Sequence, residues 1–218
     1  SGIATVTVFT QGDVTFDDPI AGHGTIGYGG LEWARAGIGM WHGKELSAGS
    51  SPMVHGFQLW IALPPELERA EPEAQYLGAD LMPSIGPARL IVGIYQTGTS
   101  PARAPRGLNY LLVTLKPGER WTYEPPGGHT VAWVAVSEGA LSGSGRLSNG
   151  ELVIFEPGEA PINFEGAEGT GATFVLGSAV PHPYELHLGA YSVHTSADAL
   201  AAGERHIREL KERLDARG

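Results

Sequence analysis

The segment 39–46, with the sequence GMWHGKEL, places a histidine three residues before a carboxylate. His42 could ligate a metal ion through its imidazole ring, and Glu45 could act as a second ligand or as a base. Imidazole and carboxylate ligands suit a divalent metal such as iron(II), and they leave positions open for substrate and oxygen. The first question is therefore whether this segment is part of a metal site.

The spacing within this segment leaves two interpretations open. Side chains two residues apart share one face of a strand, which places Lys44 rather than Glu45 beside His42. A lysine ammonium does not ligate a cation. A β-bulge at Gly43 would turn Glu45 towards His42 and complete the pair. In the alternative, Glu45 lies at the surface and His42 is hydrogen-bonded without a metal.

Strands must position these residues, because short apolar runs recur between turns rich in glycine and proline. The sequence predicts a strand at 1–16, broken by a turn at 11–13. It predicts further strands at 24–28, 32–34, 55–63, 89–96, 111–115, 130–136, 151–155, 160–164 and 173–177. Regular short strands of this kind are typical of a β-sandwich or barrel. One helix is predicted at 196–217, with Ser196 as its N-cap.

An internal repeat divides the chain into two β units. Residues 10–12 (TQG) align with residues 137–139 (SEG) at an offset of 127, and the strand ATVTVF then falls on VAWVAV. The later copy has a further strand before the aligned one, at 110–128, whereas the earlier copy begins inside its aligned strand. We therefore expect the first unit to lack its leading strands. The predicted domains are 1–98 and 107–195, followed by the helix, with 96–107 as a linker.

Composition excludes several classes of function. The net charge of −10 argues against direct binding of nucleic acid and of anionic membranes, because both require clustered lysine and arginine. The absence of cysteine excludes disulfides, thiolate nucleophiles and cysteine-based zinc sites. No apolar run approaches the roughly 20 residues that a membrane-spanning helix needs. We expect a cytoplasmic protein.

The span 24–63 resembles the pirin family of bicupins. This chain has GTIGYGGLEWARAGIGMWHGKE and then HGFQLWIALPPELERAEPEAQY. The family carries G-D-L/V-Q-W-M-T-A-G-x-G-I/L-x-H-x-E and then H-G-L/F-Q-L-W-V/I-N-L-P. The resemblance implies an all-β fold of two tandem cupin barrels (double-stranded β-helices, jelly-roll-like) with a C-terminal α-helix. It also implies one mononuclear divalent metal, usually iron, in the first barrel, and either quercetin dioxygenase activity or redox-linked regulation through a protein partner.

Only one of the family's metal ligands has a matching residue in this chain. His42 matches the histidine of H-x-E, but Lys44 stands where the family has glutamate. The two histidines of the family's H-P-H motif would lie before Ser1 and are absent, so metal binding is expected only if they are restored. Glu45 is the candidate catalytic carboxylate and, with His42, a candidate ligand. The second barrel is expected to be metal-free.

Further residues are predicted to lie in a pocket, on the surface or in a loop. The predicted pocket residues are Trp33, Met40, His55 and Gln58, with a small aromatic or flavonoid-like molecule as the expected substrate. His55 could also be a rim histidine that is satisfied by hydrogen bonds, and Trp33 a core residue. The carboxylates of PPELERAEPE (residues 64–73) are predicted to form a charged surface run, and the histidines of PHPYELHLGAYSVH (residues 181–194) to lie in a connecting loop.

Overall fold

The computed structural model describes residues 1–41, 45–143 and 145–216. In that part of the chain, strands β1 to β20 precede one α-helix, α1 (Ala197–Asp215), and a 3-10 turn lies at Ala79–Leu81. The side chain of Ser196 accepts a hydrogen bond from the backbone N–H of Ala199, as expected of an N-cap. The predicted all-β fold with a C-terminal helix is confirmed.

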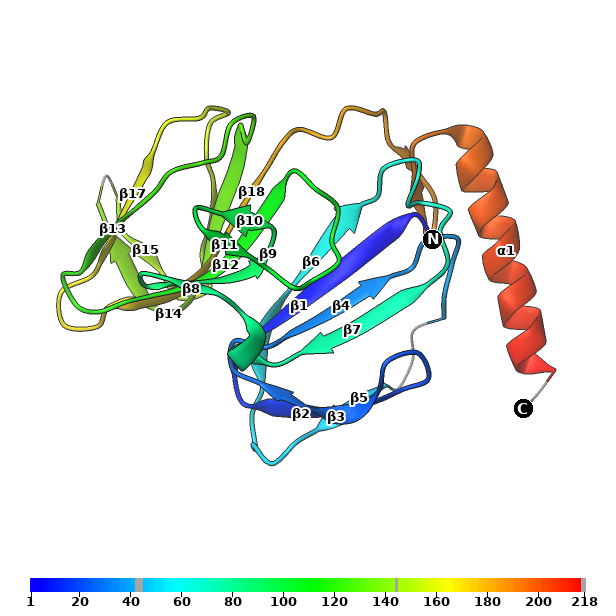
Figure 1. The fold of residues 1–218 in the computed structure, drawn as a ribbon, viewed down its shortest axis with the longest axis horizontal. Helices are drawn as coiled ribbons and strands as arrows, with labels where there is room; N and C mark the ends of the chain where they lie inside the picture. Colours follow the sequence, from blue (N-terminus) through cyan, green and yellow to red (C-terminus); the bar gives the residue numbers. More distant parts are fainter. Residues whose placement is uncertain (42–44, 144, 217–218) are drawn as a thin grey trace.

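The first unit consists of two antiparallel sheets (Figure 1). One has the order β6-β1-β4-β7 and the other the order β3-β2-β5. Phe9, Val14 and Ile26 form a small apolar core in this unit. The strand bounds are β1 (Ile3–Gln11), β2 (Asp13–Asp18), β3 (Gly22–Gly27), β4 (Leu31–Arg35), β5 (Leu46–Ala48), β6 (His55–Ala62) and β7 (Glu73–Leu77).

The second unit is a curled nine-stranded sheet of order β13-β17-β14-β18-β12-β9-β8, with β15 and β16 also paired to β14. Two short pairs, β10 with β11 and β19 with β20, lie outside this sheet. The bounds are β8 (Ser84–Ile85), β9 (Ala88–Val92), β10 (Ile94–Tyr95), β11 (Gly98–Thr99), β12 (Leu108–Leu115), β13 (Arg120–Tyr123), β14 (Val131–Ser142), β15 (Leu147–Ser148), β16 (Leu152–Ile154), β17 (Ile162–Gly166), β18 (Ala172–Ala179), β19 (His187–Leu188) and β20 (Val193–His194).

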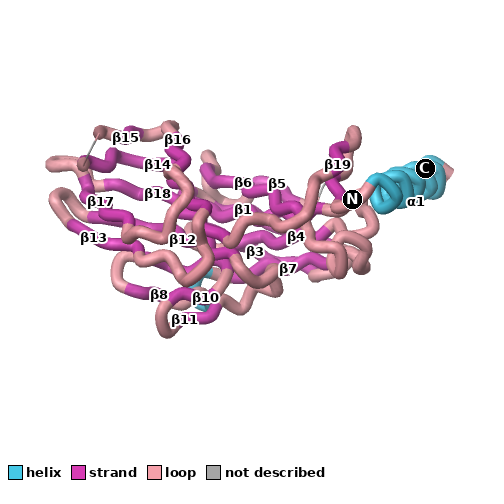
Figure 2. Tube along the Cα trace, turned by 90° about the horizontal axis from the view of Figure 1, so that it is seen from above, coloured by secondary structure: helices cyan, strands magenta, loops and turns pink. Residues whose placement is uncertain are grey.

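The two units pack against each other through a shared apolar core. Successive side chains of a strand point to opposite faces, and on β1 the buried face carries Ala4, Val6 and Val8. This face packs with Tyr110 and Val175 of the second unit. The opposite face of β1 points into the first unit. Figure 2 shows α1 at the end of the molecule away from the second unit, close to the start of β1.

The internal repeat is confirmed by the position of two β-bulges. The register of β1 against β6 shifts between Phe9 and Gln11, and that of β14 against β18 shifts between Val136 and Glu138. Both pairs are separated by the predicted offset of 127. These bulges make β6 and β18 equivalent strands. On its other side β18 pairs with β12 over eight residues, whereas β6 is an edge strand within the described chain.

The segment between the two predicted domains is ordered and bonded. Ser100 is buried, and its hydroxyl donates to the backbone oxygen of Ile91 at 2.6 Å. Strands β8 and β9 precede residue 98, yet they belong to the sheet of the second unit. The boundary at residue 98 remains a prediction.

Candidate functional site

A cavity of about 310 Å³ lies between the inner face of the first unit and α1. Its walls are mostly apolar, with two indole rings and a few polar groups. Alternation on β1 places Ile3 and Thr5 on this face, opposite the buried Ala4 and Val6. The lining residues are Ser1, Ile3, Thr5, Ala34, Ala36, Met40, Trp41, Gln58, Trp60, Tyr191 and Ile207.

The predicted pocket residues fall in three places. Met40 and Gln58 line the cavity. His55 is exposed at the start of β6, where it pairs with Gln11 beside the bulge. Trp33 is fully buried, at 0% exposure, in the core between the two units. Its assignment to the pocket is therefore corrected, because it lies on the face of β4 that points away from the cavity.

The predicted metal ligands are only partly within the described residues. His42, Gly43 and Lys44 lie outside them, as does the proposed bulge at Gly43. Glu45 is half-buried just before β5, and its backbone oxygen accepts a hydrogen bond from the N–H of Asp17 at 2.8 Å. Among the described residues, no group of three or more histidine, cysteine, aspartate or glutamate side chains could hold a metal ion.

A polar row crosses the sheet beside the cavity. Thr7 of β1 lies opposite Gln58 of β6 and Glu32 of β4, and Glu32 lies opposite Tyr76 of β7. The hydroxyl of Thr7 donates to Glu32 Oε2 at 3.0 Å, and the phenol of Tyr76 lies 3.4 Å from Glu32 Oε1 and 3.2 Å from Asp18 Oδ2. Glu32 is only 1% exposed. The row places a buried carboxylate inside the first unit.

The tyrosine of this row remains a hydrogen-bond donor. Burial raises the pKa of Tyr76 well above its usual value, and the neighbouring carboxylates of Glu32 and Asp18 raise it further. Thr7, Glu32 and Tyr76 were not predicted as site residues. The alternation of LEWAR could have indicated Glu32, because it faces away from the apolar Leu31 and Trp33.

A second buried network joins the segment just before α1 to the first unit. His194 Nδ1 lies 3.2 Å from Glu68 Oε2, and its Nε2 lies 2.9 Å from Ser1 Oγ. Glu68 also accepts hydrogen bonds from the backbone and the hydroxyl of Thr195. Burial lowers the pKa of His194, although the Glu68 carboxylate opposes this shift. The histidine is therefore held neutral, with Nδ1–H donating to Glu68.

This network corrects two expectations. Glu68 belongs to the run predicted to be surface carboxylates, yet it is only 3% exposed. His194 was predicted to lie in a loop, whereas it is a buried residue of β20 that pairs with His187 of β19.

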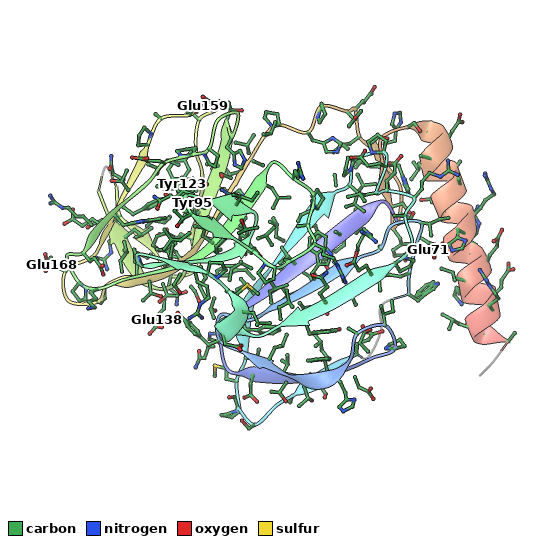
Figure 3. The ribbon with its side chains drawn as sticks, in the orientation of Figure 1. Glu71, Tyr95, Tyr123, Glu138, Glu159 and Glu168 are labelled. Carbon is green, nitrogen blue, oxygen red and sulfur yellow. The ribbon has the colours of Figure 1, made fainter. Side chains whose placement is uncertain are left out.

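The interior of the second unit is filled by aromatic side chains. Figure 3 shows Tyr95 and Tyr123 side by side there, and their ring centroids are 4.9 Å apart. Phe164 and Phe174 follow at 5.0 Å. The phenol of Tyr123 lies 2.6 Å from the hydroxyl of Ser178. This interior is a packed core, in contrast to the cavity of the first unit.

Comparison with solved structures defines the class of fold. Quercetin 2,3-dioxygenase from Acinetobacter baumannii superposes with a TM-score of 0.77 at 24% identity, over 96% of this chain and 76% of that one. The bacterial pirin YhhW from Escherichia coli, solved in complex with nickel(II), gives a TM-score of 0.56 at 15% identity, over 83% of this chain and 74% of that one. The fold is that of the cupins.

Sequence comparison narrows this class to one family. The pirin family profile matches residues 1–61. A pirin-like protein of Caulobacter vibrioides is 32% identical over 147 residues, which are 64% of this chain and 52% of that protein. The chain thus matches about half the length of this relative. These similarities support a pirin-family cupin.

No helix in the described part of the chain is long and apolar enough to cross a membrane.

Proposed function

We propose that the first unit binds a small aromatic, flavonoid-like molecule in the cavity beside α1, as part of a pirin-like metal-dependent dioxygenase. The observation that carries this proposal is the cavity itself, with an apolar wall and two indoles that are both about half exposed or more. Trp41 directly precedes the candidate metal ligand His42 in the sequence. The name of the Acinetobacter structure supports the same substrate class.

The residues present do not fit the family's complete set of metal ligands. The described residues contain no cluster of three ligands. The sequence has Lys44 at the position of the family's glutamate. His42 and Glu45 would supply two of the required donors, and iron is the expected ion. A bound metal would supply the redox chemistry that activates oxygen.

The mismatch in ligands favours a second candidate function. In this alternative, the chain is a metal-free, regulatory bicupin that engages a protein partner without catalysis. A cytoplasmic location is part of both proposals.

Metal analysis and ligand binding, carried out in parallel, test these proposals. We would express the protein with added iron, measure its metal content by plasma mass spectrometry, and titrate it with quercetin while following tryptophan fluorescence. The first proposal predicts saturable quercetin binding. Once the two histidines of the family's H-P-H motif are restored, it also predicts near-stoichiometric metal that is lost in His42→Ala, and oxygen uptake with quercetin. Binding without metal or oxygen uptake would favour the second candidate. Absence of quercetin binding would overturn the assignment of the cavity.

A further inference from the structure

A directional chain of hydrogen bonds runs from the cavity to the buried carboxylate of Glu32. The indole N–H of Trp60 donates to Gln58 Oε1 at 2.9 Å, and Gln58 Nε2 donates to Thr7 Oγ1 at 3.3 Å. Thr7 in turn donates to Glu32 Oε2 at 3.0 Å. The paired positions of three neighbouring strands, β6, β1 and β4, bring Gln58, Thr7 and Glu32 together.

The chemistry of its two ends fixes the direction of this chain. An indole nitrogen can only donate, and at the other end the Thr7 hydroxyl donates to Glu32 Oε2. The amide oxygen of Gln58 must therefore face Trp60, and its nitrogen must face Thr7. Rotating the amide by 180° would set its NH₂ group against the indole N–H, so both neighbouring bonds oppose the flip.

This arrangement leaves one N–H of Gln58 for a ligand. The amide nitrogen carries two hydrogens, and the chain uses one of them. Gln58 is exposed and lines the cavity. A molecule in the cavity therefore meets a hydrogen-bond donor in a fixed orientation.

The two indoles of the cavity are also held in place by hydrogen bonds from their N–H groups. Trp41 Nε1 donates to the backbone oxygen of Ile207 in α1 at 3.3 Å, and Trp60 Nε1 donates to Gln58. Both polar N–H groups are thus used by the protein. The ring surfaces of Trp41, 46% exposed, and Trp60, 64% exposed, remain for contact with a ligand.

We propose that Gln58 is the specificity-determining residue of this cavity, and that it selects planar aromatic ligands that carry a carbonyl oxygen. Thr7 and Glu32 are positioning residues, because they act on the ligand only through the orientation of Gln58. This inference rests on the proposed function, in which the cavity is the ligand site.

The test uses two planar molecules that differ only in the carbonyl group, 9-fluorenone and fluorene. Titration of the purified protein, followed by tryptophan fluorescence, should give about three- to tenfold tighter binding of fluorenone, the effect of one net hydrogen bond. Gln58→Leu should abolish this preference, so that fluorenone and fluorene bind with equal affinity. Thr7→Val should reduce the preference, and Thr7→Ser should retain it.

Controls separate this inference from the proposal on which it rests. Thr122→Val removes a threonine hydroxyl that donates to Asn163 in the second unit, and should leave both affinities unchanged. Circular dichroism and urea unfolding would verify that each variant is folded. Equal binding of the two molecules to the unaltered protein, or a preference that survives Gln58→Leu, would overturn the role of Gln58 alone. Failure of both molecules to bind would overturn the cavity assignment together with it.

Discussion

The two units share one strand framework but differ in what fills it. At the repeat offset of 127, Thr5 and Thr7 of β1 correspond to Ala132 and Val134 of β14. In the first unit these positions face a cavity and a buried carboxylate. In the second, Val134 packs in an aromatic core with Phe174. The same backbone therefore supports an open cavity or a closed core, depending on a few inward-facing side chains.

The largest difference between the units should appear when an aromatic side chain is removed from each interior. Phe174 is fully buried, and Phe174→Ala should lower the free energy of unfolding by about 3–5 kcal/mol. Trp60 is 64% exposed, and Trp60→Ala should cost less than about 1 kcal/mol. Urea denaturation measures both values. Similar losses in the two variants would contradict the contrast between a packed and an open interior.

The equivalent glycines that follow the two bulges should respond alike. Gly12 and Gly139 have φ values of 76° and 70°, and an added Cβ would lie 2.1 Å from Met53 O and 2.3 Å from Gly171 O, respectively. Each Gly→Ala variant should cost about 1–3 kcal/mol in unfolding free energy. Gly150→Ala is the control, because φ is 83° but nothing lies within 4 Å. It should lose only about 1–2 kcal/mol, the conformational cost alone.

The buried histidines of the two units should make stability depend on pH in the same direction. Burial lowers the pKa of His129 and of His194 below the unfolded value of about 6.5. Below that pH the unfolded chain binds more protons than the folded one, so the free energy of unfolding should fall as the pH drops through 6.5.

Thermal unfolding between pH 8 and pH 5 measures this dependence. The variant His129→Gln/His194→Gln should flatten the slope between pH 7 and pH 5.5, while losing about 1–2 kcal/mol at pH 8 through broken hydrogen bonds. A slope that is unchanged in the double variant would assign the pH dependence to other groups.

The smallest effect concerns a hydrogen bond between two equivalent residues of the repeat. Ser137 Oγ donates to Thr10 Oγ1 at 2.7 Å, and these two residues are equivalent in the repeat. A double-mutant cycle with Thr10→Val and Ser137→Ala should give a coupling energy of about 0.5–1.5 kcal/mol. A coupling energy near zero would mean that this bond does not stabilise the contact between the units.

Strand alternation and turn residues were sufficient to predict most of the fold. The β-branched pattern of residues 3–10 and the N-cap at Ser196 were local signals, and the repeat rested on one short strand and its glycine turn. Strands β5 and β7 were not among the predicted strands, and neither were the two-residue strands β8, β11, β15, β19 and β20. Strand β7 follows the acidic run PPELERAEP, and its sequence EAQYL acquires strand structure through pairing with β4. Such pairing depends on residues distant in the sequence, which propensity alone does not report.

The site was harder to predict than the fold, because alternation identifies two faces without saying which one is inward. Met40 and Gln58 line the cavity, whereas Trp33 lies on the opposite face of its strand, in the core. The buried role of Glu68 could not be predicted either. Its partners, His194 and Thr195, are more than 120 residues away in the sequence.

The pairing of β9 with β12 determines what happens when the two halves of the chain are separated by a protease or at the level of the gene. Strand β9 precedes the segment 96–107 and β12 follows it, yet the two are hydrogen-bonded neighbours in one sheet. A protease that cleaved between them would leave the two fragments associated through this sheet and the core between the units. A gene fragment that ended in the same segment would encode β9 without its partner β12. The remaining part would encode β12 without β9. Strand β9 thus ties the two halves together across the segment 96–107.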